Sequence, residues 1–577
     1  MKKVIFAVAA GCVVFGVIVL FLEPAQYFFG DSIAVLWGRP HSFGSLLKDF
    51  VRLDGGHWYR PLSNSLPPFV LFPFFGMQFK PYHLVAIALH CLFCIGLFEI
   101  FRRLLRDSLA AFVSTAFFAF HPIQFYATYD IAFYQEPIMA ALTIASLILF
   151  CRYIERPRVP VLLVGLFTFL GALCAKETSV VMPALLILAF RGRRDIYGLP
   201  SARNALVSAA GIAGFFTLLY SRVISASFLY QPTYRPRIEL HAVGDAVRGL
   251  LWSFGIPAGV ETQAWQYPFG IELGLWFLFV VIVALAVARP DSGVWRGLVW
   301  FFVAAGPAFF TRHLLPHHLY LGVAGVAYGV GQAVAWIRAR EFHRAVPARA
   351  SYALACGAVA LIFCAGYLDA RSDSAHSWVG ESSRRIQDTG DFLRSARVDL
   401  SKSQGILAVI GDAQYLRFDW MGGAFFNMLG GDELEVRLAD WQPEHIPEGF
   451  YALKYDSKGL RKITDVETLH TNALTAPEAP LVVSFQLTAA RVYAGDSYCL
   501  NVPRFAGQTI DVKYHYNQRP ASVAYSFAHL NSKGTACVDV AASVPWGKVD
   551  VVGVRPSGSL RWSSASAEIE VLPAFSW

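Results

Sequence analysis

Several polar side chains that could carry chemistry stand at separated places in an otherwise apolar sequence. In chain order they are Asp31, the pair Tyr59-Arg60, His121, Glu136, the pair Lys176-Glu177 and the pair His317-His318. Carboxylates accept protons or bind metal ions, whereas Arg and Lys bind anions such as phosphates. What these residues do therefore depends on which elements hold them and whether the fold brings them together.

The composition indicates that those elements are membrane-spanning helices. The chain has 577 residues, of which 55% are hydrophobic and 16% charged, whereas soluble proteins carry about 25% charged residues. This composition excludes a disordered chain, a collagen-like chain and a small disulfide-rich scaffold. The net charge is +8, but Lys and Arg form short clusters between apolar runs. That pattern is typical of membrane-protein loops and argues against a nucleic-acid partner.

Eleven apolar segments are predicted to cross the bilayer, for which a helix needs about 20 residues. The first, Val4–Phe21, precedes Leu22-Glu23-Pro24, which is a poor signal-peptide cleavage site, so we expect it to be retained as a span. The other ten are Tyr82–Phe101, Leu109–Tyr126, Ile131–Arg152, Pro160–Ala175, Ser179–Phe190, Ala205–Ser221, Gly270–Ala288, Val294–Phe310, Leu319–Ile337 and Tyr352–Leu368.

Four arginine clusters orient these spans. They follow the second, fourth, sixth and tenth spans and comprise Arg102, Arg103 and Arg106; Arg152, Arg156 and Arg158; Arg191, Arg193 and Arg194; and Arg338, Arg340 and Arg344. All four lie on the cytoplasmic side if the N-terminus is cytoplasmic. The polar residues named above then collect at the outer face, and the chain after Leu368 lies outside the cytoplasm. For any single one of these polar residues, the alternative to a functional role is interfacial anchoring or a structural ion pair. Charged side chains at membrane depth, however, usually face a cavity.

The chain after residue 370 has a different pattern from the membrane domain at 1–370. Residues 371–479 are predicted to form a linker with an amphipathic helix, Arg371–Arg397, and a small α/β unit with a buried strand at Gly405–Gly411 and a helix at Phe418–Leu429. Residues 480–577 contain short β-rich segments separated by turn residues, which predicts a β-sandwich. These segments are Leu481–Leu487, Ser497–Val502, Thr509–Tyr516, Ala521–Phe527, Ala536–Ala542, Lys548–Val554 and Ala567–Val571.

Two of the nine cysteines, Cys499 and Cys537, lie in predicted strands of the last region, whereas most of the others lie in apolar spans. A disulfide between them is permitted outside the cytoplasm, although the strand register decides whether the two can meet. The sequence contains no zinc-finger spacing, P-loop or dinucleotide-binding glycine motif. No cofactor is predicted, and a divalent metal held by Asp31, Glu136 and His121 is left open.

Five short motifs follow one another on the predicted outer face. They are Phe29-Gly30-Asp31-Ser32-Ile33-Ala34, Tyr59-Arg60-Pro61-Leu62, Phe120-His121-Pro122-Ile123, Leu173-Cys174-Ala175-Lys176-Glu177-Thr178 and His317-His318-Leu319-Tyr320-Leu321. Their order resembles the GT-C superfamily of integral-membrane glycosyltransferases, and within it the branch of TMTC-type and PMT-like O-mannosyltransferases and their bacterial relatives. The resemblance covers about residues 1–370.

The resemblance implies an enzyme that moves a sugar, such as a mannose-like hexose, from a polyprenyl-phosphate carrier to a protein, lipid or glycan acceptor outside the cytoplasm. Asp31 would be the general base, and Lys176 and Arg60 would bind the lipid phosphate, with His317 or His318 in support. Tyr59, His121, Glu136 and Glu177 would contact the substrate or orient these groups. We expect a bacterial inner membrane, with the active face and the C-terminal region in the periplasm.

The sequence departs from the family pattern at three positions and in its tail. Gly30-Asp31 stands where many relatives have two acids, Tyr126 where a Glu is frequent, and His317 where relatives carry an Arg. The tandem helical repeats found after the membrane region of many relatives are absent. Two alternatives remain open: a glycolipid transporter or flippase, which would show internal repeats and polar residues leading to both faces, and a non-catalytic envelope assembly protein.

Overall fold

The computed structural model describes most of the helical region and the principal strands of the tail. The described residues are 28, 30–51, 59–129, 131–190, 199–230, 239–256, 268–311, 314–339, 348–376, 378–395, 405–409, 424–430, 434–439, 450–456, 459–462, 486–487, 491–493, 497–516, 523–539, 547–556 and 567–572. The predicted first span, Val4–Phe21, and the arginine cluster at 191–194 lie outside these residues.

Each of the ten other predicted spans contains a helix. In chain order these helices are α5 (Phe79–Leu105), α6 (Ser108–Ala119), α8 (Gln135–Glu155), α9 (Val159–Ala175), α10 (Met182–Phe190), α12 (Pro200–Tyr230), α14 (Phe269–Ala288), α15 (Val294–Phe309), α16 (Tyr320–Ala339) and α17 (Ala348–His376). Among the described residues, five helical segments are long and apolar enough to cross a membrane: 79–105, 131–155, 200–221, 269–288 and 316–339. The prediction of a polytopic, mostly helical membrane protein is confirmed at this level, and five shorter apolar helices accompany these segments.

The predicted third span, Leu109–Tyr126, is wrong as a single helix. α6 ends at Ala119, and the chain continues as α7 (Gln124–Tyr129) and the short 3₁₀ turn η2 (Ile131–Phe133) before α8 begins. His121 precedes Pro122, and a residue before proline is disfavoured in the α-helical region. The break leaves a run of short elements between α6 and α8.

One end of the bundle is held together by ion pairs between helix ends. Arg102 and Arg103 near the end of α5 pair with Glu99, and Arg103 also lies 3.2 Å from Glu155 at the end of α8. Arg338 at the end of α16 lies 2.6 Å from Asp107, which caps the beginning of α6. The ends of α5, α8 and α16 therefore meet the beginning of α6, as the predicted cytoplasmic face requires.

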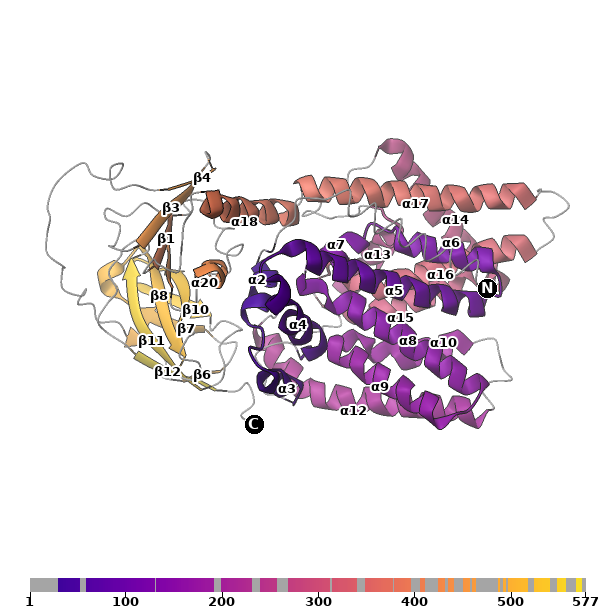
Figure 1. The fold of residues 1–577 in the computed structure, drawn as a ribbon, viewed down its shortest axis with the longest axis horizontal. Helices are drawn as coiled ribbons and strands as arrows, with labels where there is room; N and C mark the ends of the chain where they lie inside the picture. Colours follow the sequence, from indigo (N-terminus) through magenta and orange to yellow (C-terminus); the bar gives the residue numbers. More distant parts are fainter. Residues whose placement is uncertain are drawn as a thin grey trace.

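Several short helices that the sequence analysis did not predict lie at the opposite end. They include α2 (Gly30–Trp37), α3 (Phe43–Val51), α4 (Leu66–Phe75) and the π-helical turn η1 (Pro61–Ser65). Figure 1 shows α2, α3 and α4 at the end of the helical bundle that is nearest to the strands of the tail. A further short helix, α13 (His241–Trp252), precedes α14.

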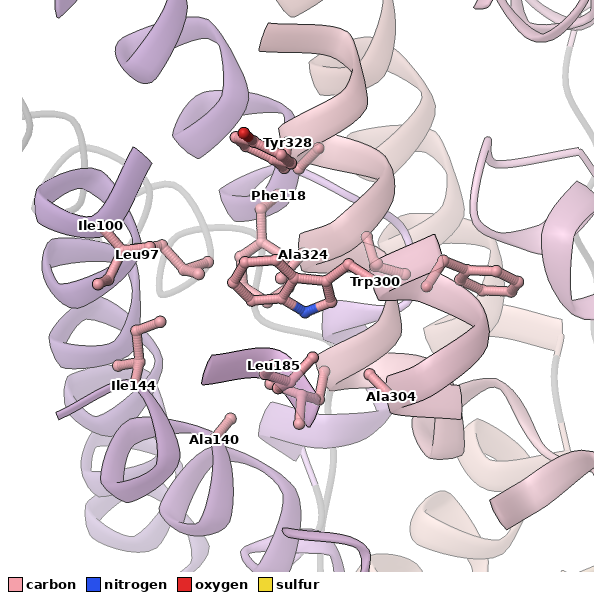
Figure 2. Close-up of a cluster of buried hydrophobic side chains, with 14 of the residues drawn as sticks. Leu97, Ile100, Phe118, Ala140, Ile144, Leu185, Trp300, Ala304, Ala324 and Tyr328 are labelled. Atoms are coloured by element: carbon pink, nitrogen blue, oxygen red, sulfur yellow. The ribbon is translucent and has the colours of Figure 1, made fainter. Parts of the chain in front are cut away.

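The core of the bundle is filled by large apolar side chains from helices far apart in the sequence. Figure 2 shows Trp300 of α15 among Phe118, Ala324 and Leu185, which come from α6, α16 and α10. The Trp300 ring is buried, with its centroid 6.1 Å from that of Tyr328 and 6.3 Å from that of Phe101. This packing joins α5, α6, α10, α15 and α16 through one apolar core.

α17 continues to His376 and α18 (Trp378–Ser395) follows, so most of the segment Arg371–Arg397, for which an amphipathic helix was predicted, is helical. Next comes a small α/β sheet in the order β2-β1-β3-β4, where β1 is Gly405–Val409, β2 Glu435–Ala439, β3 Phe450–Asp456 and β4 Gly459–Lys462. β1 runs parallel to β2 and β3, and α20 (Ala424–Gly430) lies between β1 and β2 in the chain. The proposed boundary at residue 370 lies within α17, and the division of the chain into three domains stays a prediction.

Two further sheets form the end of the chain. Their orders are β10-β7-β5 and β6-β12-β11-β8-β9. The strands are β5 (Gln486–Leu487), β6 (Arg491–Tyr493), β7 (Ser497–Asn501), β8 (Thr509–Tyr516), β9 (Val523–His529), β10 (Thr535–Asp539), β11 (Gly547–Pro556) and β12 (Ala567–Leu572). All except β6 overlap a predicted strand, but the face-to-face packing of a sandwich stays a prediction.

The strand register bears on the predicted disulfide. β7 and β10 are antiparallel, and Cys499 stands directly opposite Cys537. Cys499 is disulfide-bonded. The side chain of Cys537 lies outside the described residues, so its identity as the partner remains our proposal, supported by the register.

Candidate functional site

A buried arginine joins two distant segments of the chain. The Arg60 guanidinium donates two hydrogen bonds to the Glu177 carboxylate, from Nε to Oε2 at 2.8 Å and from Nη2 to Oε1 at 2.5 Å. Its Nη1 donates to Oε1 of Gln135. Arg60 stands just before η1, Glu177 begins the 3₁₀ turn η3 (Glu177–Val181), and Gln135 begins α8. Two parallel hydrogen bonds from a guanidinium to a carboxylate hold the two groups in one relative orientation, in addition to the attraction between their charges.

A second ion pair lies beside the first in the sequence. The Lys176 Nζ donates to Oε1 of Glu136, and these side chains are only 4% and 1% exposed. Lys176 precedes Glu177, and Glu136 follows Gln135. We call these five residues, Arg60, Gln135, Glu136, Lys176 and Glu177, the charged network.

The backbone conformation at Lys176 explains why Lys176 and Glu177, which are adjacent in the sequence, bind different partners. Lys176 stands between α9 and η3 with extended dihedrals, φ −161° and ψ 134°. Successive side chains on extended backbone point to opposite sides, so Lys176 reaches Glu136 whereas Glu177 reaches Arg60. The Ser63 hydroxyl of η1 donates to the Ala175 carbonyl at 2.7 Å and holds the end of α9 against η1.

The charged network balances its own charge. Arg60 and Lys176 supply two positive charges, and Glu136 and Glu177 supply two negative ones. Burial alone would lower the pKa of Arg60, but the adjacent Glu177 carboxylate outweighs it, so the pKa lies above the ordinary arginine value. Arg60 therefore stays charged, and an incoming anion has to compete with carboxylates for both cations.

Two tyrosines border the charged network. The Tyr59 hydroxyl donates to the Phe50 carbonyl at 2.7 Å and so ties the end of α3 to the residue before Arg60. Its ring centroid lies 6.3 Å from that of Phe216 on α12. Tyr220, one turn further along α12, has a buried hydroxyl that interacts electrostatically with Glu177 but lies outside hydrogen-bond geometry. These contacts of Tyr59 position the chain, and its predicted contact with the substrate stays a prediction.

Asp31 is placed by its backbone only. It is the second residue of α2, and its side chain lies outside the described residues. α2 contacts η2, which ends at Phe133, two residues before Gln135. The backbone thus places the helix that carries Asp31 next to the segment that leads into the charged network.

His121 lies apart from the charged network. Its Nδ1 accepts a hydrogen bond from the Ile123 N–H at 3.2 Å, and its ring packs on Phe117. The Nε2 is buried near the Ser253 backbone, outside hydrogen-bond geometry. Within the described part of the chain, none of the contacts of His121 reaches the charged network, so its predicted substrate role has no support from these contacts.

The histidine pair lies in the 3₁₀ turn η6 (Pro316–Leu319), directly before α16. The His317 ring stacks on Phe133 with centroids 4.2 Å apart, and His318 packs edge-on against His317 at 4.3 Å. Phe133 belongs to η2, so His317 lies close to the beginning of α8. Three residues after His317, the Tyr320 hydroxyl is 2.7 Å from Nδ1 of His90 on α5, and it interacts electrostatically with Glu136. The last motif is thus anchored beside the charged network.

Sequence reasoning missed two contributors to this arrangement. Gln135 binds Arg60, and Tyr220 borders Glu177, but neither was a predicted site residue. Gln135 directly precedes Glu136 at the beginning of a predicted span, which is a signal that could have been used; Tyr220 stands in the apolar run of α12, and nothing in its surroundings distinguishes it. Among the described residues, no group of three or more His, Cys, Asp or Glu side chains is placed to hold a metal ion. The side chain of Asp31 is not among these described residues.

Comparison with known proteins gives a distant structural likeness. No protein-family model and no curated protein sequence matches the chain. Among solved structures, the chain is similar to the crystal structure of the Archaeoglobus fulgidus oligosaccharyltransferase in complex with zinc and sulfate, with a TM-score of 0.36 and 10% sequence identity. The match covers 97% of this chain and 98% of that chain. A likeness of this size does not establish a shared activity.

Proposed function

We propose that this protein is a GT-C-type glycosyltransferase that moves a sugar from a polyprenyl-phosphate carrier to an acceptor hydroxyl outside the cytoplasm. The proposal does not specify the sugar, the chain length of the carrier or the choice among protein, lipid and glycan acceptors. The proposed setting is a bacterial inner membrane, with the reactive face and the tail in the periplasm.

The observation that carries the proposal is the charged network itself. Three segments separated by more than 30 residues in the sequence deliver two cations and two carboxylates, nearly buried, to one place at the end of an apolar bundle. Buried charges are costly within a membrane protein and are found mostly where substrates or ions pass. The cations belong to two of the motifs that resemble the GT-C superfamily.

The proposed reaction assigns a task to each kind of group. The acceptor oxygen attacks the anomeric carbon, the bond from that carbon to the phosphate oxygen breaks, and the lipid phosphate leaves. Asp31 takes the proton that the acceptor hydroxyl loses. Arg60 and Lys176 stabilise the leaving phosphate, for which they have to exchange part of their pairing with Glu177 and Glu136.

The test is transfer of a labelled sugar from a polyprenyl-phosphate donor by purified protein in nanodiscs. We expect Asp31→Asn to lower turnover by about 100-fold or more, as loss of a general base does, without changing the thermal unfolding midpoint. Arg102→Gln, which alters the ion pairs at the opposite end of the bundle, is the matched control and should retain turnover. Full activity of Asp31→Asn would reject Asp31 as the base, and inactivity of the wild-type protein with a panel of donors would reject the proposed reaction.

A further inference from the structure

The tail and the outer end of the bundle share one apolar cluster. Its buried members from the bundle side are Phe28, Ile33, Leu36, Tyr82, Ala86, Ile87, Ile131 and Tyr134, and those from the tail are Ile386, Leu393, Ile406, Phe425, Phe426, Leu434 and Leu453. The two parts are therefore packed against each other through a hydrophobic core and are not merely tethered by α17.

The centre of this junction is a contact between two short helices. α20 of the tail contacts α2 of the bundle, and Figure 1 shows α20 on the side of the tail that faces α2. Phe425 and Phe426 of α20 are fully buried, with ring centroids 5.4 Å apart, and Ile33 and Leu36 of α2 are fully buried as well. Burying such side chains is the principal source of stability for an interface of this kind.

α2 depends on its neighbours for its conformation. It has eight residues, and isolated helices shorter than about 12 residues are marginal in water. Its principal contacts are with η2, α4 and α20. Because Ile33 and Leu36 stand two and five residues after Asp31, the cluster that buries them also sets the position and the order of the backbone that carries Asp31.

We propose that Phe425 and Phe426 are positioning residues, through which the tail holds α2, and with it Asp31, in its working place beside η2. The consequence for catalysis rests on the proposed function; the ordering of α2 does not. The α/β unit of the tail would thus complete the reactive face, a role separate from any acceptor binding by residues 480–577.

The experiment measures backbone order and turnover separately. Hydrogen exchange with mass spectrometry is recorded on full-length protein in nanodiscs for wild type, Phe425→Ala, Phe426→Ala and the milder Phe425→Leu. We expect peptides covering residues 30–37 to exchange at least tenfold faster in the alanine variants and less so in Phe425→Leu, while peptides from α8 and α9 are unchanged. Leu429→Ala, at an exposed position of the same helix, should leave α2 as in the wild type.

The outcomes separate this inference from the proposed function. Where the wild type transfers sugar, turnover should fall in both alanine variants with little change in the KM for the donor, and should recover in Phe425→Leu. Unchanged exchange in residues 30–37 would overturn the inference, as would faster exchange with full turnover. If peptides from β1 also exchange faster in an alanine variant, that substitution has loosened the α/β sheet itself. The exchange of residues 30–37 in the milder Phe425→Leu variant then decides whether α20 orders α2. An inactive wild type would remove the proposed function, and exchange in α2 would still decide whether the tail orders that helix.

Discussion

At the scale of single residues, the Lys176–Glu136 pair offers the strongest prediction for stability. Replacing Lys176 by Met leaves the Glu136 carboxylate buried without its counter-ion, which typically costs about 3–5 kcal/mol. Replacing both, by Lys176→Met with Glu136→Leu, removes the uncompensated charge and should recover most of that loss. Unfolding by denaturing detergent, followed by tryptophan fluorescence, measures the difference.

The matched control is the pair Arg394–Asp391 on α18, whose side chains are 65% and 55% exposed. Exposed pairs contribute about 0–1 kcal/mol, so Arg394→Met should have little effect on the free energy of unfolding. A double variant of Lys176 and Glu136 that is as unstable as the single variant, or less stable, would show that the pair is not an isolated buried couple.

Sequence reasoning identified four of the five residues of the charged network but could not pair them. Residue type, spacing and the positive-inside pattern place Arg60, Glu136, Lys176 and Glu177 at one membrane face. Pairing depends on the backbone between them. The extended conformation of Lys176, which separates it from Glu177, follows from how α9 ends against η1, and that contact is tertiary.

At the scale of elements, α15 and α16 approach each other through glycines. A Cβ atom added to Gly297 of α15 would lie 2.5 Å from the carbonyl oxygen of Gly325 and 2.5 Å from the backbone nitrogen of Gly329, both on α16. Close approach of backbones through small residues is a principal means of helix association in membranes. Gly297→Ala should therefore force the helices apart and destabilise the fold by about 1–3 kcal/mol.

Gly306 provides the control on the same helix, because an added Cβ there meets nothing within 4 Å. Gly306→Ala should be neutral or slightly stabilising, since alanine is the better helix former. Thermal unfolding midpoints in nanodiscs compare the two variants. Equal midpoints would mean that α15 can shift without cost, in conflict with the tight packing around Trp300.

The elements also show where prediction from sequence ends. Long apolar runs indicated a helix for each of the ten spans within the described residues, but hydropathy did not fix their ends, since α12 continues to Tyr230 and α17 to His376. The break after Ala119 and the helices α2, α3 and α4 were missed, since short helices of eight to twelve residues form through tertiary contacts rather than through a long periodic pattern. In the tail, alternation and turn residues predicted most strands, but the parallel pairing of β1 with β2 and β3 depends on contacts between distant segments.

At the scale of the whole molecule, the predicted topology places the connection between α8 and α9 and the tail on opposite sides of the membrane. Seven predicted spans, the fifth to the eleventh, lie between residue 158 and the tail. Because seven is an odd number of crossings, residue 158 and the tail are predicted on opposite sides of the membrane. The ion pairs that join the end of α8 to α5, and α16 to α6, gather at the end of the bundle that the arginine clusters assign to the cytoplasm. The outer helices, the charged network and the tail occupy the other end.

Labelling of single cysteines tests this arrangement. Arg158 and Lys533 are both exposed, and each is replaced by Cys in a background in which the exposed Cys356 and Cys364 are Ala. A membrane-impermeant maleimide should label Lys533→Cys in intact spheroplasts and Arg158→Cys only after permeabilisation. Labelling of both positions from the same side would require an even number of crossings between them. The charged network would then face a different compartment from the tail, in conflict with the contact of α2 with α20.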